Sequence, residues 1–157
     1  MSTNTYEQLG SRIAVQDALV AMFTATDDRD WDAVAAAFAD RVALDYTSLS
    51  GGEPAVLSGR QIAEAWSAAL GGLDATHHLT GNYLIDVEAD RATARFAATA
   101  THRRAGGHGD PLWTLGARYH AELRPTGGRW LITALTMTAI WGQGNQAILG
   151  QAGPERA

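Results

Sequence analysis

Three polar side chains occupy positions where the pattern of the sequence calls for apolar ones: Asp27, His78 and His102. Asp27 falls on the inner face of a predicted helix, and each histidine falls in a predicted strand. A carboxylate and two imidazoles that meet in one apolar cavity can form an acid/base site without a cofactor, because burial and mutual pairing tune such groups for proton transfer near neutral pH. The sequence therefore indicates a small enzyme.

Each of these residues also has a structural interpretation. Asp27 could cap a helix or pair with an arginine, and His78 could be a satisfied structural histidine. His102 could be a surface histidine at the end of a strand. The adjacent His77 should point to the opposite face of its strand and have a structural or interfacial role.

A tyrosine and several large apolar side chains could complete the site. Tyr46 alternates with Leu44 and Val42 along a predicted strand, so its phenol faces inward, either as a core residue or as a hydrogen-bond donor to a carbonyl or an enolate. The residues expected to line a substrate pocket are Phe23, Trp66, Trp113, Met137 and Trp141.

Asp27, His78 and His102 also form a two-histidine, one-carboxylate set of the kind that binds iron or zinc. We expect no metal, because a carboxylate that orients a histidine is not available as a direct ligand. We expect no cofactor either, since the dinucleotide-like segment at 142–147 has no strand-helix-strand unit around it. The chain has no cysteine and no Gly-x-Ser-x-Gly motif, so it offers no candidate for covalent catalysis.

The overall composition excludes several classes of partner. The 157 residues have a formal net charge of -5, and the arginines are dispersed, so nucleic acid and anionic lipid are not expected to bind. No apolar stretch has the length of a membrane span, and the first residues do not resemble a signal peptide. We expect a single cytoplasmic domain over 1–157, with its core at about 6–145 and a Gly-rich C-terminal tail, that binds a small molecule.

Hydrophobic periodicity predicts helices first and strands afterwards. Helices are expected at 6–27, 31–39 and 60–70, with a short strand at 41–47 between the second and the third. Four longer strands are expected near 77–88, 91–103, 112–124 and 129–141, separated by turn-prone residues. This order predicts an antiparallel meander that packs against the helices.

The same periodicity predicts which faces are buried. In the first helix, one narrow arc is apolar and continues to Asp27; it holds Leu9, Ile13, Val20 and Phe23. In the second long strand, strict alternation sends His102 to the same inner face as Phe96. The last strand is apolar or threonine on both faces, which predicts a homodimer or homotrimer that covers the outer face of the sheet.

Short motifs carry a family resemblance. They are the run at 25–32, Leu44 to Ser48, Thr76 to Leu79, Ala100 to His102 and Ile140 to Gly142. In order and spacing they resemble the scytalone dehydratase family, within the SnoaL-like group of the nuclear-transport-factor-two-like superfamily. The resemblance covers about residues 8–145. It implies a catalytic pair at Asp27 and His78, a second histidine at His102 and a tyrosine at Tyr46. We expect His78 to abstract a proton next to a carbonyl, Tyr46 to stabilise the enolate and His102 to protonate the departing hydroxide.

One position departs from the family pattern, because Thr26 stands where those dehydratases have a second functional tyrosine. The resemblance implies an α+β cone-shaped fold, a cystatin-like α+β roll, in which three N-terminal helices pack in a curved, largely antiparallel mixed β-sheet. It also implies a cofactor-free lyase, dehydratase-like, that acts on a small apolar cyclic or aromatic hydroxy-carbonyl compound. A polyketide cyclase, a ketosteroid-isomerase-like isomerase and a non-catalytic ligand-binding or interaction module are the alternatives.

Overall fold

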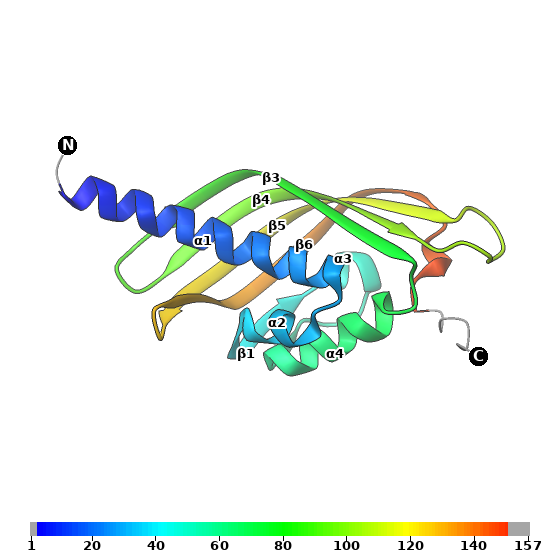
Figure 1. Cartoon of the computed structure of the whole chain (residues 1–157), viewed down its shortest axis with the longest axis horizontal. Helices are drawn as coiled ribbons and strands as arrows, with labels where there is room; N and C mark the ends of the chain where they lie inside the picture. The colour runs from blue at the N-terminus through cyan, green and yellow to red at the C-terminus, as the bar shows by residue number, and fades with distance from the viewer. Residues whose placement is uncertain (1–2, 151–157) are drawn as a thin grey trace.

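The computed structural model describes residues 3–150 of the chain, with side chains from residue 6. It is an α+β fold in which helices lie on one face of a curved, unclosed six-stranded sheet (Figure 1), as the sequence predicts. The elements in chain order are α1 (Thr3–Asp28), α2 (Trp31–Ala36), β1 (Phe38–Asp45), α3 (Thr47–Ser50), β2 (Ala55–Leu57), α4 (Gly59–Leu70), β3 (Ala75–Val87), β4 (Ala92–Arg103), β5 (Leu112–Thr126), β6 (Arg129–Gly144) and the 3-10 helix η1 (Gln146–Ile148).

The strands follow the order β2-β1-β6-β5-β4-β3 across the sheet. The pair β1 and β6 is parallel and every other pair is antiparallel, so the sheet is mixed and largely antiparallel. A two-residue turn joins β5 to β6, and Gly127 and Gly128 both have positive φ there, at 57° and 77°. Two successive left-handed residues form the hairpin turn that matches strand twist, which explains the glycine pair.

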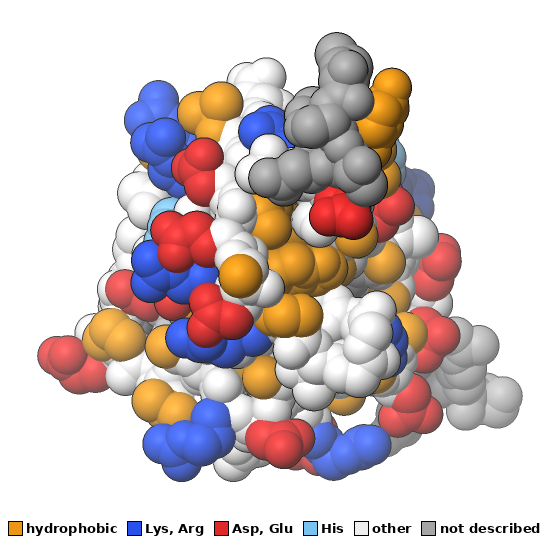
Figure 2. Space-filling view, turned by 90° about the vertical axis from the view of Figure 1, so that its left-hand side faces the viewer, with side chains coloured by type: hydrophobic (Ala, Val, Ile, Leu, Met, Phe, Trp, Pro, Cys, Tyr) orange, Lys and Arg blue, Asp and Glu red, His pale blue; other side chains and the backbone are white. Residues whose placement is uncertain are grey.

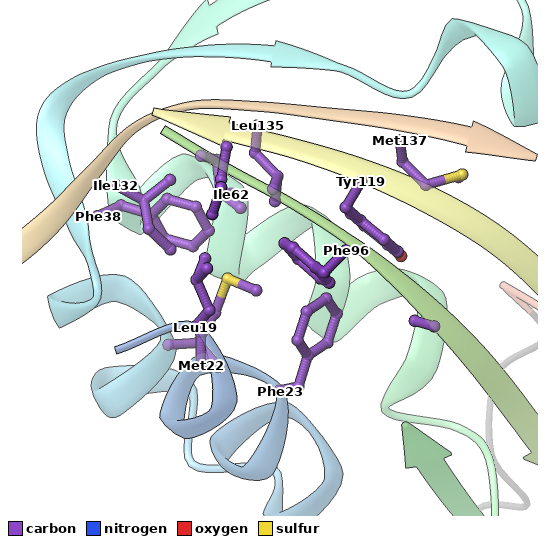
Figure 3. Close-up of a cluster of buried hydrophobic side chains, with 14 of the residues drawn as sticks. Leu19, Met22, Phe23, Phe38, Ile62, Phe96, Tyr119, Ile132, Leu135 and Met137 are labelled. Carbon is purple, nitrogen blue, oxygen red and sulfur yellow. The ribbon is translucent and has the colours of Figure 1, made fainter. Parts of the chain in front are cut away.

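The inner face of the sheet follows the alternation expected for β4. Its alternate residues from Ala92 to His102 are buried, and the residues between them are partly or fully exposed. Small alanines leave room for α1, while Phe96 stacks on Tyr119 with ring centroids 5.0 Å apart. Figure 3 shows Phe23 of α1 directed toward these two rings, so the core joins α1 to the centre of the sheet.

The predicted apolar arc of α1 is wrong along most of its length. Leu9, Ile13 and Val20 are exposed, and of the residues in that arc Phe23 is the buried one. The buried face is turned around the helix and consists of Val15, Leu19, Met22, Phe23, Ala25 and Thr26. The helix is apolar on more than one side, so periodicity could not show which side meets the sheet, and its first turns extend past the core.

The first turns of α1 carry exposed apolar residues, at one end of the molecule. Tyr6, Leu9 and Ile13 are each more than half exposed. Figure 2 views the molecule from that end and shows hydrophobic side chains gathered between charged ones.

Among the residues that the structure describes, no helix combines the length and apolar character needed to cross a membrane.

The region between α1 and α4 differs from the prediction. The second helix ends at Ala36 rather than near residue 39, and β1 begins at Phe38 rather than at residue 41. Pairing of Phe38 with Ile132 of β6 extends the strand backward, a tertiary contact that local pattern does not reveal. The short elements α3 and β2 were not predicted. Helix α4 begins one residue earlier than expected, with a capping box between Ser58 and Gln61.

Candidate active site

The centre of the site is a hydrogen-bonded pair between the end of α1 and the start of β3. Asp27 Oδ1 lies 2.7 Å from His78 Nδ1, and Asp27 Oδ2 accepts a 2.8 Å hydrogen bond from the backbone N–H of His78. A carboxylate is an acceptor only, so the imidazole presents Nδ1–H to it. The aspartate therefore fixes both the tautomer and the orientation of His78.

Thr76 adds a third hydrogen bond to this carboxylate, from its hydroxyl to Asp27 Oδ1 at 2.9 Å. Thr76 and His78 are two residues apart on β3 and share its inner face. Burial raises the pKa of the Asp27 carboxyl, but the hydrogen bonds from His78 and Thr76 and the charge of His78 outweigh it and leave the pKa below its usual value. Asp27 is therefore ionised at neutral pH.

His102 lies beside His78 on the neighbouring strand β4. His78 pairs with Ala100 and His102 pairs with Thr76, so the two imidazoles are diagonal neighbours with ring centroids 6.0 Å apart. Nδ1 of His102 lies 3.2 Å from the carbonyl oxygen of Trp113. This oxygen can only accept, so Nδ1 carries the proton and Nε2 has a free lone pair whenever the ring is neutral.

Burial keeps that second histidine neutral. His102 is 4% exposed and stacks on Trp113, with ring centroids 5.0 Å apart. Burial lowers its pKa from 6.5 to about 4, although the hydrogen bond to Trp113 opposes the shift. At neutral pH His102 is thus mainly a neutral hydrogen-bond acceptor, which gives little support to the role of proton donor expected for it.

A pair of phenols forms another part of the site. Tyr46 follows β1 directly, at the N-terminal cap of α3, and its ring meets that of Tyr119 at a centroid distance of 6.4 Å. Burial raises the pKa of both tyrosines, that of Tyr119 to about 12. Both phenols therefore stay protonated at neutral pH.

These groups surround a cavity of about 130 Å³ between the inner face of the sheet and the helices. A cavity of about 150 Å³ holds one benzene molecule, so this one suits a ligand with a single ring. The lining residues are Phe23, Thr26, Tyr46, Leu49, Trp66, Ala69, Leu70, His78, Ala100, His102, Trp113, Leu115, Tyr119, Met137 and Leu149. The structure therefore brings together His78, His102 and Tyr46, with Asp27 directly behind His78.

Four of the five residues expected to line the pocket do so: Phe23, Trp66, Trp113 and Met137. Trp141 does not, and the expectation for it is wrong. Ala117 pairs with Ala139 and Gly116 pairs with Trp141, so β6 carries one extra residue, a β-bulge that reverses the alternation. The indole of Trp141 consequently lies on the outer face over Gly116, and this side chain is 48% exposed.

Other polar residues near the motifs lie outside the cavity, where they face solvent or hydrogen-bond to nearby turns and helix ends. His77 is exposed on the opposite face of β3, as predicted. Asp45 accepts hydrogen bonds from the backbone and hydroxyl of Thr47, and Asp30 caps α2 through the backbone N–H of Ala33. None of these carboxylates lines the cavity.

Sequence reasoning missed several residues of the site, among them Tyr119, Thr76 and Leu149. Tyr119 and Thr76 could have been found from strand alternation, because they share the inner faces of Leu115 and His78. Leu149 gave no signal, since it lies in a segment interpreted as a loose Gly-rich tail. In the structure β6 continues to Gly144, η1 follows, and Leu149 reaches the cavity.

Among the described residues, no group of three or more His, Cys, Asp or Glu side chains is arranged to hold a metal ion. The carboxylate of Asp27 faces Nδ1 and the backbone of His78, and His102 Nδ1 faces a carbonyl oxygen. The carboxylate of Asp27 and the Nδ1 atoms of both histidines are therefore engaged in hydrogen bonds, and each histidine keeps only Nε2 as a further donor atom.

The chain belongs to the SnoaL-like domain family, whose model matches residues 7–136. A comparison with curated proteins gives no match. A solved structure of a candidate aromatic ring hydroxylase from Novosphingobium aromaticivorans is similar, with a TM-score of 0.77, 25% identity and coverage of 88% of this chain and 96% of the other. This similarity and the family match agree with the cone-shaped fold.

Two further solved structures are similar in fold. A candidate scytalone dehydratase from the same species gives a TM-score of 0.78 at 18% identity, covering 98% of this chain and 99% of the other. A hexachlorocyclohexane dehydrochlorinase, LinA type 2, gives a TM-score of 0.72 at 18% identity, covering 97% and 99%. Both names describe elimination reactions on small molecules.

Proposed function

We propose that this protein is a lyase that removes water from a small ring compound carrying a hydroxyl group and a carbonyl group. The observation that carries the proposal is the Asp27–His78 pair, with 2.7 Å between Oδ1 and Nδ1, at the wall of an apolar cavity. A carboxylate that holds an imidazole in one tautomer is the arrangement of a general base. The dehydratase and dehydrochlorinase among the structural relatives support an elimination.

His78 is the base in this proposal. Its Nδ1–H is held by Asp27, so Nε2 is the ring nitrogen that can accept a proton from a substrate in the cavity. Transfer of a proton to Nε2 creates an imidazolium that the ionised carboxylate stabilises. Phe23 supports the ring at a centroid distance of 5.0 Å and excludes water from one side.

His102 binds the departing hydroxyl group rather than protonating it. With Nδ1 donating to the Trp113 carbonyl, Nε2 of His102 accepts a hydrogen bond from the substrate hydroxyl and orients it. At a pKa of about 4, on the order of one molecule in a thousand would have this histidine protonated at pH 7. Because so small a fraction of His102 is protonated, this residue is a poor general acid for the leaving group.

The reaction then balances with one base. His78 Nε2 removes the proton from the carbon next to the carbonyl, and the electron pair moves to the carbonyl oxygen as an enolate. A phenol of the Tyr46 and Tyr119 pair donates a hydrogen bond to that oxygen. The enolate expels the hydroxyl group, the proton on His78 passes to it, and the products are water and an unsaturated carbonyl compound.

The size of the cavity favours a substrate with one ring. A steroid or a polycyclic polyketide is far larger than the single-ring ligand that about 130 Å³ accommodates, so the cavity gives these isomerase and cyclase substrates less support. An isomerase acting on a small ring ketone would use the same residues and differ only in where the proton returns. A non-catalytic module would bind the same compounds and leave them unchanged.

The test is to incubate the protein with single-ring β-hydroxy ketones in deuterated water and follow them by mass spectrometry and NMR. Loss of water with catalytic turnover supports the lyase. Exchange of the α-proton without loss of water indicates an isomerase, and binding without either indicates a ligand-binding module. The proposal also requires that dialysis against a chelator leave turnover unchanged, since no metal takes part in any step.

A further inference from the structure

Helix α1 ends in a motif in which glycine is the usual residue, but this chain has an arginine there. The backbone N–H of Asp30 donates to the carbonyl oxygen of Ala25 at 2.9 Å. The backbone N–H of Arg29 donates to that of Thr26 at 3.2 Å. These two bonds form a Schellman motif, which places Arg29 in the left-handed region, with φ at 59°. Glycine adopts this conformation without strain, whereas the Cβ of an arginine makes it unfavourable.

Among the residues that the structure describes, one other residue that is not glycine has a positive φ. It is Asn82, at 55°, within the irregularity of β3 between Gly81 and Leu84. Asparagine is enriched in the left-handed region, because its short polar side chain hydrogen-bonds locally. Arginine has no such preference, so the conformation of Arg29 points to a role for its side chain.

The side chain of Arg29 joins the end of α1 to the segment that leads into β3. Its guanidinium donates to the carbonyl oxygen of Leu73 at 2.6 Å and to that of Asp27 at 3.4 Å. Arg29 is half-buried and Leu73 is buried, so the shorter bond lies within the packed part of the molecule. A charged donor makes a stronger hydrogen bond than a neutral one, and the planar guanidinium can serve two acceptors at once.

This bridge and the Asp27–His78 pair connect the same two segments. The Asp27 carboxylate accepts hydrogen bonds from Thr76 and from His78 on β3. Leu73 precedes Thr76 by three residues, so the guanidinium holds the chain just before the residues that the carboxylate holds. Attachment at one point would let β3 pivot against α1, whereas attachment at two points fixes both the separation and the direction of the strand.

We propose that Arg29 is a positioning residue for the Asp27–His78 pair: its guanidinium holds the start of β3 against the end of α1 and so keeps the carboxylate at hydrogen-bond distance from His78 Nδ1. Its value for catalysis rests on the proposed function, in which His78 is the base. Arg29 is not among the residues that line the cavity, so it does not contact a substrate there. A base slightly displaced from its orienting carboxylate removes protons more slowly, because productive geometry tolerates little displacement.

The experiment observes the Nδ1–H protons of His78 and His102 by NMR, in protein that contains ¹⁵N-labelled histidine. Such a proton gives a signal only while a hydrogen bond protects it from rapid exchange with water, so the signal of His78 reports its contact with Asp27. The Nδ1–H of His102 faces the carbonyl oxygen of Trp113 and serves as an internal reference. His78→Gln and His102→Gln assign the two signals.

The variants are Arg29→Gly, Arg29→Lys and, as the matched control, Asn82→Gly. Both glycine substitutions relieve a positive φ, but only Arg29→Gly removes the guanidinium. The His78 signal should broaden or disappear in Arg29→Gly and match the wild type in Asn82→Gly, and the His102 signal should persist in both. Arg29→Lys should keep a weakened His78 signal, since an ammonium can donate to one carbonyl but has no planar fork for two.

Thermal unfolding separates positioning from a general loss of structure. In Arg29→Gly the relief of the positive φ offsets part of the lost hydrogen bonding, so the midpoint should stay within about 5 °C of the wild type. An unchanged His78 signal in Arg29→Gly, an equal loss of the His102 signal, an equal effect of Asn82→Gly or no His78 signal in the wild type would overturn the proposal. If Arg29→Gly does not fold, Arg29→Lys decides: a weakened His78 signal supports the proposal and a wild-type spectrum overturns it.

The NMR measurement needs no turnover, so it separates this inference from the proposed function. If the signals follow the expected order but no substrate loses water, Arg29 still positions the pair and the lyase proposal fails. If water is lost but the His78 signal does not depend on Arg29, the lyase proposal stands and this inference fails. Where both hold, kcat for water loss should fall by roughly tenfold to a hundredfold in Arg29→Gly with KM changed less, because a misplaced base slows the chemistry without removing a contact to substrate.

Discussion

Asp27 is the residue on which the geometry of the site depends, because its carboxylate contacts both the ring and the backbone of His78. We predict that Asp27→Asn folds normally but lowers turnover by about a hundredfold or more, since an amide does not hold the base in its tautomer or stabilise the imidazolium. Steady-state kinetics together with thermal unfolding would check this. Asp28→Asn, the same change at the exposed neighbour, is the control, and full activity in a folded Asp27→Asn would remove Asp27 from the mechanism.

The lowered pKa of His102 predicts how the free energy of unfolding depends on pH. Its pKa is about 4 in the folded protein and 6.5 in the unfolded chain, so the unfolded state binds the proton more readily. The stability from this residue is therefore fully present above pH 6.5 and is lost as pH falls toward 4, by at most about 3 kcal/mol. Urea unfolding at several pH values between 7 and 4 measures this.

The matched variant for this prediction is His102→Gln, which keeps a polar side chain but does not titrate. Its free energy of unfolding should change less than that of the wild type between pH 6.5 and 4. The lowered pKa of Asp27 adds a separate loss of stability only as pH falls below about 3.8, outside this window. Equal slopes in the two proteins would show that His102 is not held neutral.

At the scale of elements, the end of β6 controls one wall of the cavity. Gly144 has φ 95°, and a Cβ added there would lie 2.2 Å from the carbonyl oxygen of Leu112. We predict that Gly144→Ala displaces η1, which carries Ile148 into the core and Leu149 to the cavity. Affinity for single-ring ligands should fall by about tenfold, and protease cleavage near the C-terminal segment should rise.

The control for this prediction is Gly128→Ala in the turn between β5 and β6. Gly128 also has a positive φ, at 77°, but a Cβ there meets nothing within 4 Å. Both variants bear the cost of an alanine at positive φ, about 1 kcal/mol, so their difference isolates the clash. Unchanged ligand affinity in a folded Gly144→Ala would show that the C-terminal segment does not shape the cavity.

At the scale of the whole molecule, an uncharged row of residues crosses the outer face of the sheet, with an exposed apolar side chain at each end. Leu79, Thr99, Gly116 and Trp141 are successive partners across β3, β4, β5 and β6, and Leu79 and Trp141 are 67% and 48% exposed. We propose that a second copy of the chain covers this face, as the apolar pattern of β6 predicts. Isolated exposed leucines are ordinary, but an uncharged row that presents both an exposed leucine and an exposed tryptophan favours an interface.

We predict that Leu79→Lys converts an oligomer into a monomer without unfolding it, because a buried unpaired ammonium is costly at an interface. Analytical ultracentrifugation would measure the mass, and circular dichroism would check the fold. Val56→Lys on β2 is the control, since Val56 is 58% exposed and outside this row. A wild-type protein that sediments as a monomer would contradict the prediction.

The sequence by itself determined what depends on short-range periodicity. Alternation along β4 sends His102 inward, alternation along β3 separates His78 from His77, and the order of helices and strands predicts the α+β fold. These features follow from the two-residue repeat of a strand, which is local and holds without knowledge of the partners. The Asp27–His78 pair could be expected because the motifs around it resemble a family with such a pair.

Only the tertiary structure decided which atoms meet. The rotation of α1 that exposes Leu9 and Ile13, the bulge that turns Trp141 outward and the pairing of Tyr46 with Tyr119 all depend on contacts between residues distant in sequence. The same holds for His102, since burial lowers its pKa and a carbonyl on the next strand accepts its Nδ1 proton, and both make it a weak proton donor. A sequence pattern gives the face on which a side chain lies, but its protonation depends on the surrounding solvent, charges and hydrogen bonds, and these exist only once the strands and helices have packed together.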